Sequence, residues 1–318
     1  MYPLLLKPTV TDYLWGGTKL KDEFKFETDK DIAAEAWVLS CHKDGSSVVV
    51  NGELAGKTLP EALEIWGNEI LGEKAQKFPY FPILIKLIDA KQSLSVQVHP
   101  DDEYALKNEG EFGKTEMWYI VDCEEGAELI YGFKDNISTE EFERRIKDNT
   151  LTDVCNFVPV HKGDVFFITA GTLHAIGSGI LIAEVQQNSN STYRVFDFGR
   201  LGADGKPRQL HIEKAIDVTK CEKPTIPYGN VGEITELAGG KVRQLATCDL
   251  FTAEHIDLDG EMDIENKDSF VSLLCLDGSA TLSYDDTKLK IKKGDNVFIP
   301  VSFATKLSGK AEFLYSCV

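Results

Sequence analysis

The chain has 318 residues, of which 42% are hydrophobic, so it is long enough for two folded domains with sizeable cores. Its formal net charge of −18 argues against nucleic acids and anionic membrane surfaces as partners, because both are polyanions. A small anionic substrate is compatible with this charge if a few Lys or Arg residues gather where it binds.

The composition also bears on location. The apolar opening at residues 1–8 is too short for the apolar region of a signal peptide, and no run approaches membrane-spanning length. The seven cysteines are scattered without paired metal-binding spacing, which is typical of reduced, structural thiols. We therefore expect a cytoplasmic protein without a membrane partner. The oligomeric state stays open, and a monomer is compatible with the sequence.

The first predicted elements are a strand at residues 34–40 and a helix at residues 59–77, where apolar residues recur at helical spacing. An apolar strand follows at residues 82–88, and Lys86 interrupts it. A lysine in such a run must be paired, reach solvent at a sheet edge, or bind an anion. The local sequence does not choose between an edge position and a functional one.

The next strand carries the first candidate site residues. Alternation over residues 93–99 places Ser95, Gln97 and His99 on one face and apolar residues on the other. Taken alone, three such residues would more often form an exposed polar face. A short helix is predicted next, at residues 101–108.

Two later strand-like segments complete a possible metal site. Glu116 begins an apolar strand and shares its face with Lys114, and His174 lies between apolar residues and turn glycines. In isolation His174 would more often be a core histidine with an ordinary hydrogen-bond partner. Together with Gln97 and His99, however, these groups supply two imidazoles, a carboxylate and an amide oxygen, which suit a divalent metal such as zinc.

Residues 180–187 alternate again, with Glu184 on the same face as Ile182 and Gln186. A polar loop then delivers Arg194 into an aromatic strand, in surroundings too apolar for an ordinary surface arginine. A short helix is predicted at residues 212–220.

The stretch at residues 224–240 is rich in Pro and Gly, so we predict domains at residues 1–235 and 236–318. Residues 293–300 repeat the pattern of residues 162–169, at an offset of 293 − 162 = 131. The same offset carries His174 onto Thr305, so the second copy lacks a histidine there. The sequence thus predicts two small β-barrels, the first active and the second without metal ligands.

A Gly-Asp turn, an apolar strand and a turn with a histidine form a pattern typical of cupin β-barrels. The whole set of motifs resembles the type I mannose-6-phosphate isomerases in their short bacterial form, from about Tyr13 to Arg200. This resemblance implies a mainly β fold of two cupin-type jelly-roll barrels, the first with helical insertions. The motifs are Tyr-x-Trp-Gly-Gly, Glu-Ala-Trp-x-x-Ser, Ser-Val-Gln-Val-His-Pro, Gly-Lys-Thr-Glu-Met-Trp-Tyr, Ala-Gly-Thr-Leu-His-Ala-Ile-Gly and Glu-Val-Gln-Gln-Asn-Ser-Asn-Ser-Thr-Tyr-Arg.

The same resemblance implies roles for the candidate residues. Arg194 would be the catalytic arginine, and Glu184 or a water on the metal would transfer the proton. Ser95, Lys86 and Lys114 would bind the substrate, the first two through its phosphate. One zinc ion per chain would be held by Gln97, His99, Glu116 and His174.

The implied reaction interconverts mannose 6-phosphate and fructose 6-phosphate through an enediolate, so the partner would be a small sugar phosphate. Two alternatives are a sugar-phosphate-binding cupin without turnover and an iron(II) cupin oxygenase. Gln97 as a fourth ligand and an anion pocket around Lys86 and Arg194 argue against the oxygenase. A sensor would bind the sugar phosphate without isomerising it.

Overall fold

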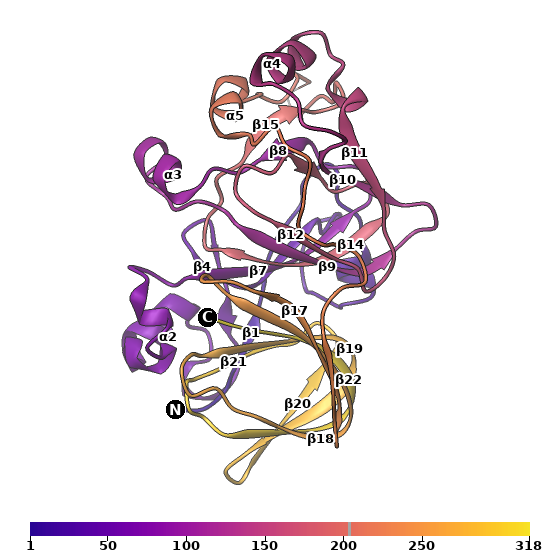
Figure 1. Cartoon of the computed structure of the whole chain (residues 1–318). Coiled ribbons are helices and arrows are strands. Elements are labelled where there is room, and N and C mark those ends of the chain that lie inside the picture. The colour runs from indigo at the N-terminus through magenta and orange to yellow at the C-terminus, as the bar shows by residue number, and fades with distance from the viewer. Residues whose placement is uncertain (203–204) are drawn as a thin grey trace.

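The chain folds mainly into antiparallel sheets, and the computed structural model describes residues 1–202 and 205–318. Two sheets face each other in the upper part of Figure 1, and a larger one lies below them. The predicted mainly β fold is confirmed.

A six-stranded sheet forms the middle layer of the molecule (Figure 1). Side chains of alternate residues, such as Trp118 and Ile182, face the five-stranded sheet above. The intervening residues, such as Tyr119 and Ala183, join an apolar core shared with the sheet below. Both faces are therefore covered, which explains why every residue of β14 is buried. The strand order is β12 (Val165–Ile168), β9 (Glu116–Cys123), β14 (Ile180–Gln187), β7 (Ile83–Ala90), β3 (Glu35–Leu39) and β2 (Thr9–Thr11).

A five-stranded sheet covers the inner face of this layer, with three helices around it (Figure 1). Its strand order is β11 (Cys155–Pro159), β10 (Glu128–Phe133), β13 (His174–Ala175), β8 (Val96–Val98) and β15 (Tyr193–Phe196). The helices are α3 (Asp102–Asn108), α4 (Thr139–Lys147) and α5 (Ile212–Val218).

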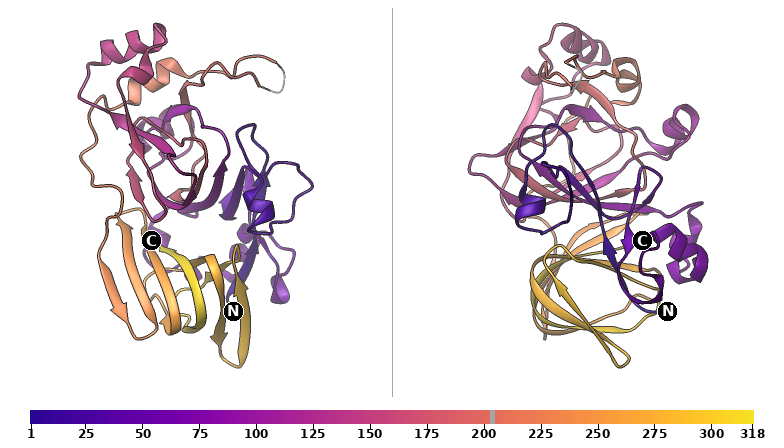
Figure 2. Two further views of the ribbon diagram at one scale, coloured as in Figure 1. Left: turned by 90° about the vertical axis from the view of Figure 1, so that its right-hand side faces the viewer. Right: turned by 180° about the vertical axis from the view of Figure 1, so that it is seen from behind.

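The third large sheet combines both ends of the chain (Figure 2). The N-terminal strand β1 pairs with β21 through Leu4, Leu5 and Leu6, so the first residues fold onto the last third of the chain. The strand order is β16 (Ile234–Leu237), β17 (Gly240–Thr247), β18 (Thr252–Ile264), β22 (Thr305–Cys317), β19 (Val271–Tyr284), β21 (Asn296–Ile299), β1 (Leu4–Lys7) and β6 (Val48–Val49), with β20 (Thr287–Lys292) paired to β19. A separate small ribbon joins β4 (Cys41–His42) and β5 (Gly45–Ser46).

The predicted helix at residues 59–77 is shorter in the structure. Helix α2 (Leu59–Trp66) starts at a Thr58 capping box and ends at Gly67, whose φ of 86° leaves the helical region. Two 3₁₀ turns continue the segment at Asn68–Leu71 and Ala75–Lys77, separated by Gly72 with φ of 84°. The remaining short elements are α1 (Lys19–Asp22) and 3₁₀ turns at Gly52–Leu54 and Leu151–Asp153.

The internal repeat read from the sequence coincides with strands of the structure. Strand β12 begins at Val165 and β21 at Asn296, which are 131 residues apart, and both strands have four residues. His174 begins β13, and Thr305 at the same offset begins β22. Among the residues that the structure describes, no helix is long and apolar enough to cross a membrane.

Asn296 connects two of the sheets and offers a test of their packing. Its side chain donates to the Val38 carbonyl at 3.0 Å and accepts from the Ser272 hydroxyl at 2.8 Å, with all three residues fully buried. We expect Asn296→Ala to lower the free energy of unfolding by about 1–3 kcal/mol, because both partners lose a bond in a dry core. Denaturant titration measures this. The exposed Asn230→Ala serves as the control, and equal stability of the two variants would contradict the inter-sheet role.

Candidate functional site

The predicted metal ligands converge from the two facing sheets. Gln97 lies in β8, and His99 is the first residue after this strand. His174 is paired with Gln97 on the neighbouring strand of the five-stranded sheet. Glu116 begins β9 in the six-stranded sheet. Alternation points all four side chains into the space between the layers.

The four side chains surround a common point. Nε2 of His99 lies 3.6 Å from Oε2 of Glu116, and Nε2 of His174 lies 3.5 Å from Oε1 of Glu116. The Gln97 amide lies 3.4 Å from Nε2 of His174, and a half-turn of the amide exchanges its nitrogen and oxygen. Ligands bound tetrahedrally at 2.0–2.1 Å from a zinc ion are about 3.3–3.4 Å apart. The observed spacing therefore fits one small cation.

Hydrogen bonds fix both imidazoles in the form that a metal needs. Nδ1 of His99 donates to the Ser191 carbonyl and Nδ1 of His174 to the Thr172 carbonyl, each at 2.9 Å. Because a carbonyl can only accept, both Nδ1 atoms carry the proton and both Nε2 atoms present a lone pair.

Burial leaves some of these ligand atoms without partners. Nε2 of His99 and Oε1 of Glu116 are buried without a hydrogen bond, which is costly for polar atoms. A bound cation would satisfy both. Within residues 1–202 and 205–318, His99, Glu116 and His174 form the one cluster of three or more His, Cys, Asp or Glu residues arranged to hold a metal.

Burial also sets the protonation of the ligands. It lowers the pKa of His99 well below its usual value, with the Lys114 charge contributing, and lowers the pKa of His174 to about 4. Both imidazoles are therefore neutral at physiological pH. Burial and then the charge of Glu184 raise the pKa of the Glu116 carboxyl, which a divalent cation beside it would counteract.

A second row of charged groups lies beside the ligands. Nζ of Lys86 lies 3.5 Å from Glu35 and 3.8 Å from Glu184, and all three residues are buried. Nζ of Lys114 lies 3.0 Å from Glu116 and 3.9 Å from Glu184. Of the possibilities that the sequence left open for Lys86, the structure shows a buried, paired lysine.

The neighbouring charges favour the ionised forms of Glu184 and Lys114. Burial opposes a charge on Glu184, but Lys114, Lys86 and the Trp118 indole N–H, which donates at 2.8 Å, lower its pKa. Burial likewise opposes a charge on Lys114, but Glu116 and Glu184 outweigh it and raise the lysine pKa. Glu184 is therefore a carboxylate held among cations.

These residues open into a cavity of about 270 Å³. Arg194 enters it from β15, directly across from Gln97, so the two side chains project on the same side. Nη1 of Arg194 donates to the Gln209 carbonyl at 2.9 Å, while its Nε is buried without a partner. Burial and then the charge of Arg208 lower the pKa of Arg194. The lining also includes Ser95, Lys86, Lys114, Glu184, Glu35, Thr192, Asn190 and Tyr13.

Sequence reasoning missed several members of this site. Glu35 and Trp118 lie on predicted strands, but their sequence positions did not indicate a role. Glu35 pairs with Lys86 and accepts a hydrogen bond from Trp37, and Trp118 donates a hydrogen bond to Glu184. Arg208 lies in a loop. No pattern in the sequence indicated that this loop places the Arg208 side chain in the cavity.

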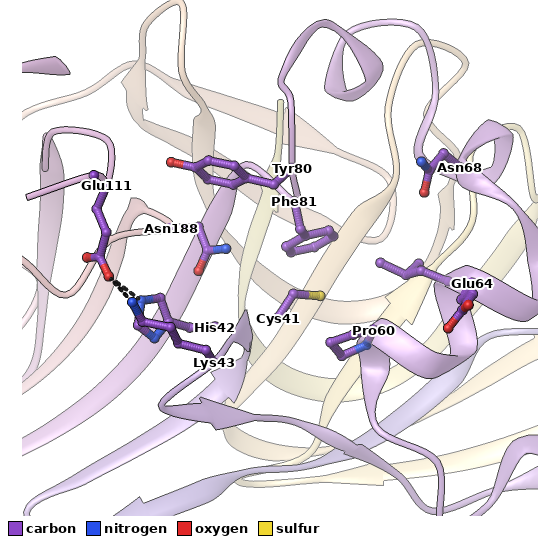
Figure 3. A pocket seen from close by; sticks show the side chains of 12 residues that line it. Cys41, His42, Lys43, Pro60, Glu64, Asn68, Tyr80, Phe81, Glu111 and Asn188 are labelled. Atoms are coloured by element: carbon purple, nitrogen blue, oxygen red, sulfur yellow. Dashed lines mark ion pairs between the residues drawn. The ribbon is translucent and has the colours of Figure 1, made fainter. Parts of the chain in front are cut away.

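A larger cavity of about 520 Å³ lies next to this site (Figure 3). Asn188 lines this cavity while Asn190 lines the first, so the polar segment 188–192 contributes to both. Glu111 pairs here with Lys43 at 2.9 Å and with His42 at 3.7 Å, as the dashed lines show. Of the four predicted metal ligands, Gln97 lines the smaller cavity, and the buried His99, Glu116 and His174 lie behind it.

Two facing antiparallel sheets around a buried His, Glu and His cluster define a metal-binding protein of the cupin class. Residues 4–154 match the model "Phosphomannose isomerase type I, catalytic domain", and residues 241–318 match "Mannose-6-phosphate isomerase, cupin domain".

Individual relatives agree with the family models. The chain is 38% identical over 321 residues to mannose-6-phosphate isomerase ManA of Bacillus subtilis, covering 99% of this chain and 98% of that protein. It is 37% identical over 302 residues to mannose-6-phosphate isomerase of Streptococcus mutans, covering 94% and 92%. A crystal structure of mannose 6-phosphate isomerase from Bacillus subtilis superimposes with a TM-score of 0.91 at 34% identity, covering all of both chains. The chain therefore belongs to the type I phosphomannose isomerase family, as the sequence motifs predicted.

The metal site can be tested by removing one ligand. We expect His174→Ala to weaken divalent metal binding by roughly 100-fold or more, because loss of even an outer-shell partner typically costs 10- to 100-fold. Elemental analysis after gel filtration would then find little metal on the variant. The control is His161→Ala, whose ring is 81% exposed on a turn. Full metal content in His174→Ala would contradict the site.

Proposed function

We propose that this chain interconverts mannose 6-phosphate and fructose 6-phosphate. The relatives' names support the substrate and the reaction. The observation that carries the proposal is the buried cluster of His99, Glu116 and His174. It lies beside the cavity that Gln97, Arg194 and two lysines line, and one of these lysines, Lys114, lies 3.0 Å from Glu116.

The metal in this proposal is one zinc ion per chain, held by Gln97, His99, Glu116 and His174. Neutral imidazole nitrogens and a carboxylate oxygen suit zinc, and the donor spacing supports four ligands around one ion. When bound, zinc would act as a Lewis acid that polarises substrate oxygens.

The protein's own groups would move the proton and balance charge. Moving a proton between C1 and C2 through an enediolate places negative charge on the substrate oxygens. Glu184, an ionised carboxylate facing the cavity, is our choice for the base that carries this proton. Arg194 would stabilise the developing negative charge with fixed donors, and Lys114 and Lys86 would contact the sugar.

The finer architecture is also part of this proposal. We assign cupin-type jelly-roll barrels to residues 1–235, with helical insertions, and to residues 236–318, where metal ligands are missing. The match of the last part of the chain to a cupin model and the 131-residue strand repeat support this division. A cytoplasmic location stays a prediction.

The reaction itself is the first test. Purified protein should convert mannose 6-phosphate to fructose 6-phosphate, lose this activity on chelation and regain it with added zinc, because the metal would stabilise charge that the side chains alone cannot. A coupled assay for fructose 6-phosphate measures each step. A folded, zinc-loaded protein without turnover would contradict the proposal and favour a sugar-phosphate-binding cupin.

Arg194 provides a sharper test of the mechanism. We expect Arg194→Ala to keep its metal but to lose about 10²–10³-fold in kcat, because it loses a preorganised charge aimed at the substrate oxygens. Metal content and steady-state kinetics measure the two effects. Arg144→Ala, on the exposed surface of α4, is the matched control. Wild-type turnover in Arg194→Ala would remove its catalytic role.

A further inference from the structure

A pair of arginines is fixed beside the cavity by one buried carboxylate. Asp197 accepts from Nε of Arg208 at 2.6 Å and from its Nη2 at 2.5 Å. It also accepts from Nη2 of Arg200 at 2.5 Å. Asp197 is only 6% exposed, so it holds both guanidinium groups in place. Arg200 is anchored further through Nη1, which donates to the Ser93 carbonyl.

Positive charge gathers around Asp197. Beside the metal ligands, Lys86 and Lys114 face Glu35, Glu116 and Glu184, which gives 2 − 3 = −1 when all are ionised. Around Asp197, Arg200 and Arg208 give 2 − 1 = +1, and Arg194 and Arg208 both line the cavity. This concentration of positive charge occurs in a chain of net charge −18, and it is suited to a dianion.

We propose that Arg208, positioned by Asp197, binds the phosphate group of the sugar phosphate together with the Ser95 hydroxyl. This inference rests on the proposed function and adds the residue that recognises the phosphate. Asp197 is a positioning residue in it.

Hydrogen-bonding capacity at Arg208 supports this role. Asp197 occupies Nε and Nη2, and no hydrogen bond of the described residues uses Nη1 of Arg208. Arg208 lines the cavity together with Ser95 and Thr192, which add hydroxyl donors. A guanidinium group held rigidly in this way presents its remaining donors to a phosphate at little cost in side-chain entropy.

The position of Ser95 just before β8 also fits the shape of the substrate. Ser95 lies two residues before Gln97, roughly 6.6 Å if the chain is extended, and both side chains line the cavity. The phosphate sits on C6 of the sugar, at the end opposite to the reacting C1 and C2. A sugar with C1 and C2 at the metal ligands would therefore extend its phosphate toward Ser95 and Arg208.

Lys86, which the sequence resemblance implied as a phosphate contact, is placed differently. Its side chain is 4% exposed, and its ammonium group already lies between Glu35 and Glu184. A phosphate there would meet two carboxylates at close range, and their repulsion would oppose its binding. Arg208 and Arg200 share a single carboxylate, Asp197, so a phosphate beside them would meet less negative charge.

The experiment measures phosphate affinity separately from turnover. Metal-loaded protein is titrated with inorganic phosphate by calorimetry, and KM and kcat are measured for mannose 6-phosphate. We expect Arg208→Gln, which keeps an N–H donor for Asp197, to lose about 10- to 100-fold in phosphate affinity, as expected for lost charge-assisted hydrogen bonds. KM should rise by a similar factor, with a much smaller change in kcat.

Matched variants make the outcome decisive. Arg208→Met removes the same charge and serves if Arg208→Gln does not fold, and the exposed Arg144→Gln is the control. Wild-type phosphate affinity in whichever Arg208 variant folds would overturn the inference. So would a larger loss of phosphate affinity in Lys86→Met. If the wild-type protein binds phosphate through Arg208 but does not isomerise the sugar, the proposed function fails while this inference stands.

Discussion

The structure depends on keeping five ionisable side chains buried between two sheets. Glu35, Glu116, Glu184, Lys86 and Lys114 are all buried, and an isolated ion there would be very unfavourable. Each lysine lies within 4 Å of two carboxylates, so opposite charges are paired, although burial and the charge of Glu184 still raise the pKa of Glu116. One carboxylate remains in excess, and the unpaired ligand atoms of Glu116 and His99 mark where a cation would balance it.

The middle sheet is what allows this arrangement. Its outer side chains form a continuous apolar core with the nine-stranded sheet, and its inner side chains alternate between apolar residues and the charged groups. The C-terminal part therefore supports the site from behind without contributing a ligand to it. Thr305, at the repeat position of His174, uses its hydroxyl to bond the Ile264 carbonyl at 2.9 Å. The same repeat position therefore holds a predicted metal ligand, His174, in the five-stranded sheet and a residue that bonds the neighbouring strand, Thr305, in the nine-stranded sheet.

Much of this was predictable from the sequence, because strand alternation fixes which face a residue occupies. That rule placed Gln97 with His99, and Ile182 with Glu184, and the structure keeps each pair on one face. Side chains that arrive from loops do not follow such a rule. Arg208 comes from a loop and lines the cavity with its guanidinium group bound by Asp197, eleven residues earlier. The prediction of one helix over residues 59–77 was wrong because it relied on apolar spacing alone. That spacing continues past Gly67 and Gly72, but both glycines have positive φ angles and end the helical backbone.

Binding of the phosphate away from the reacting carbons would have a catalytic consequence. Binding energy from a remote group accelerates a reaction only when it fixes the reacting atoms in place. Ser95 and Gln97 are two residues apart and line the same cavity, so a substrate held at Ser95 lies close to the metal ligands. Arg194 is tied to the same strand through its pairing with Gln97. Metal ligation by Gln97 and charge stabilisation by Arg194 would therefore share one strand pair, and Ser95, next to that pair, would link phosphate binding to it.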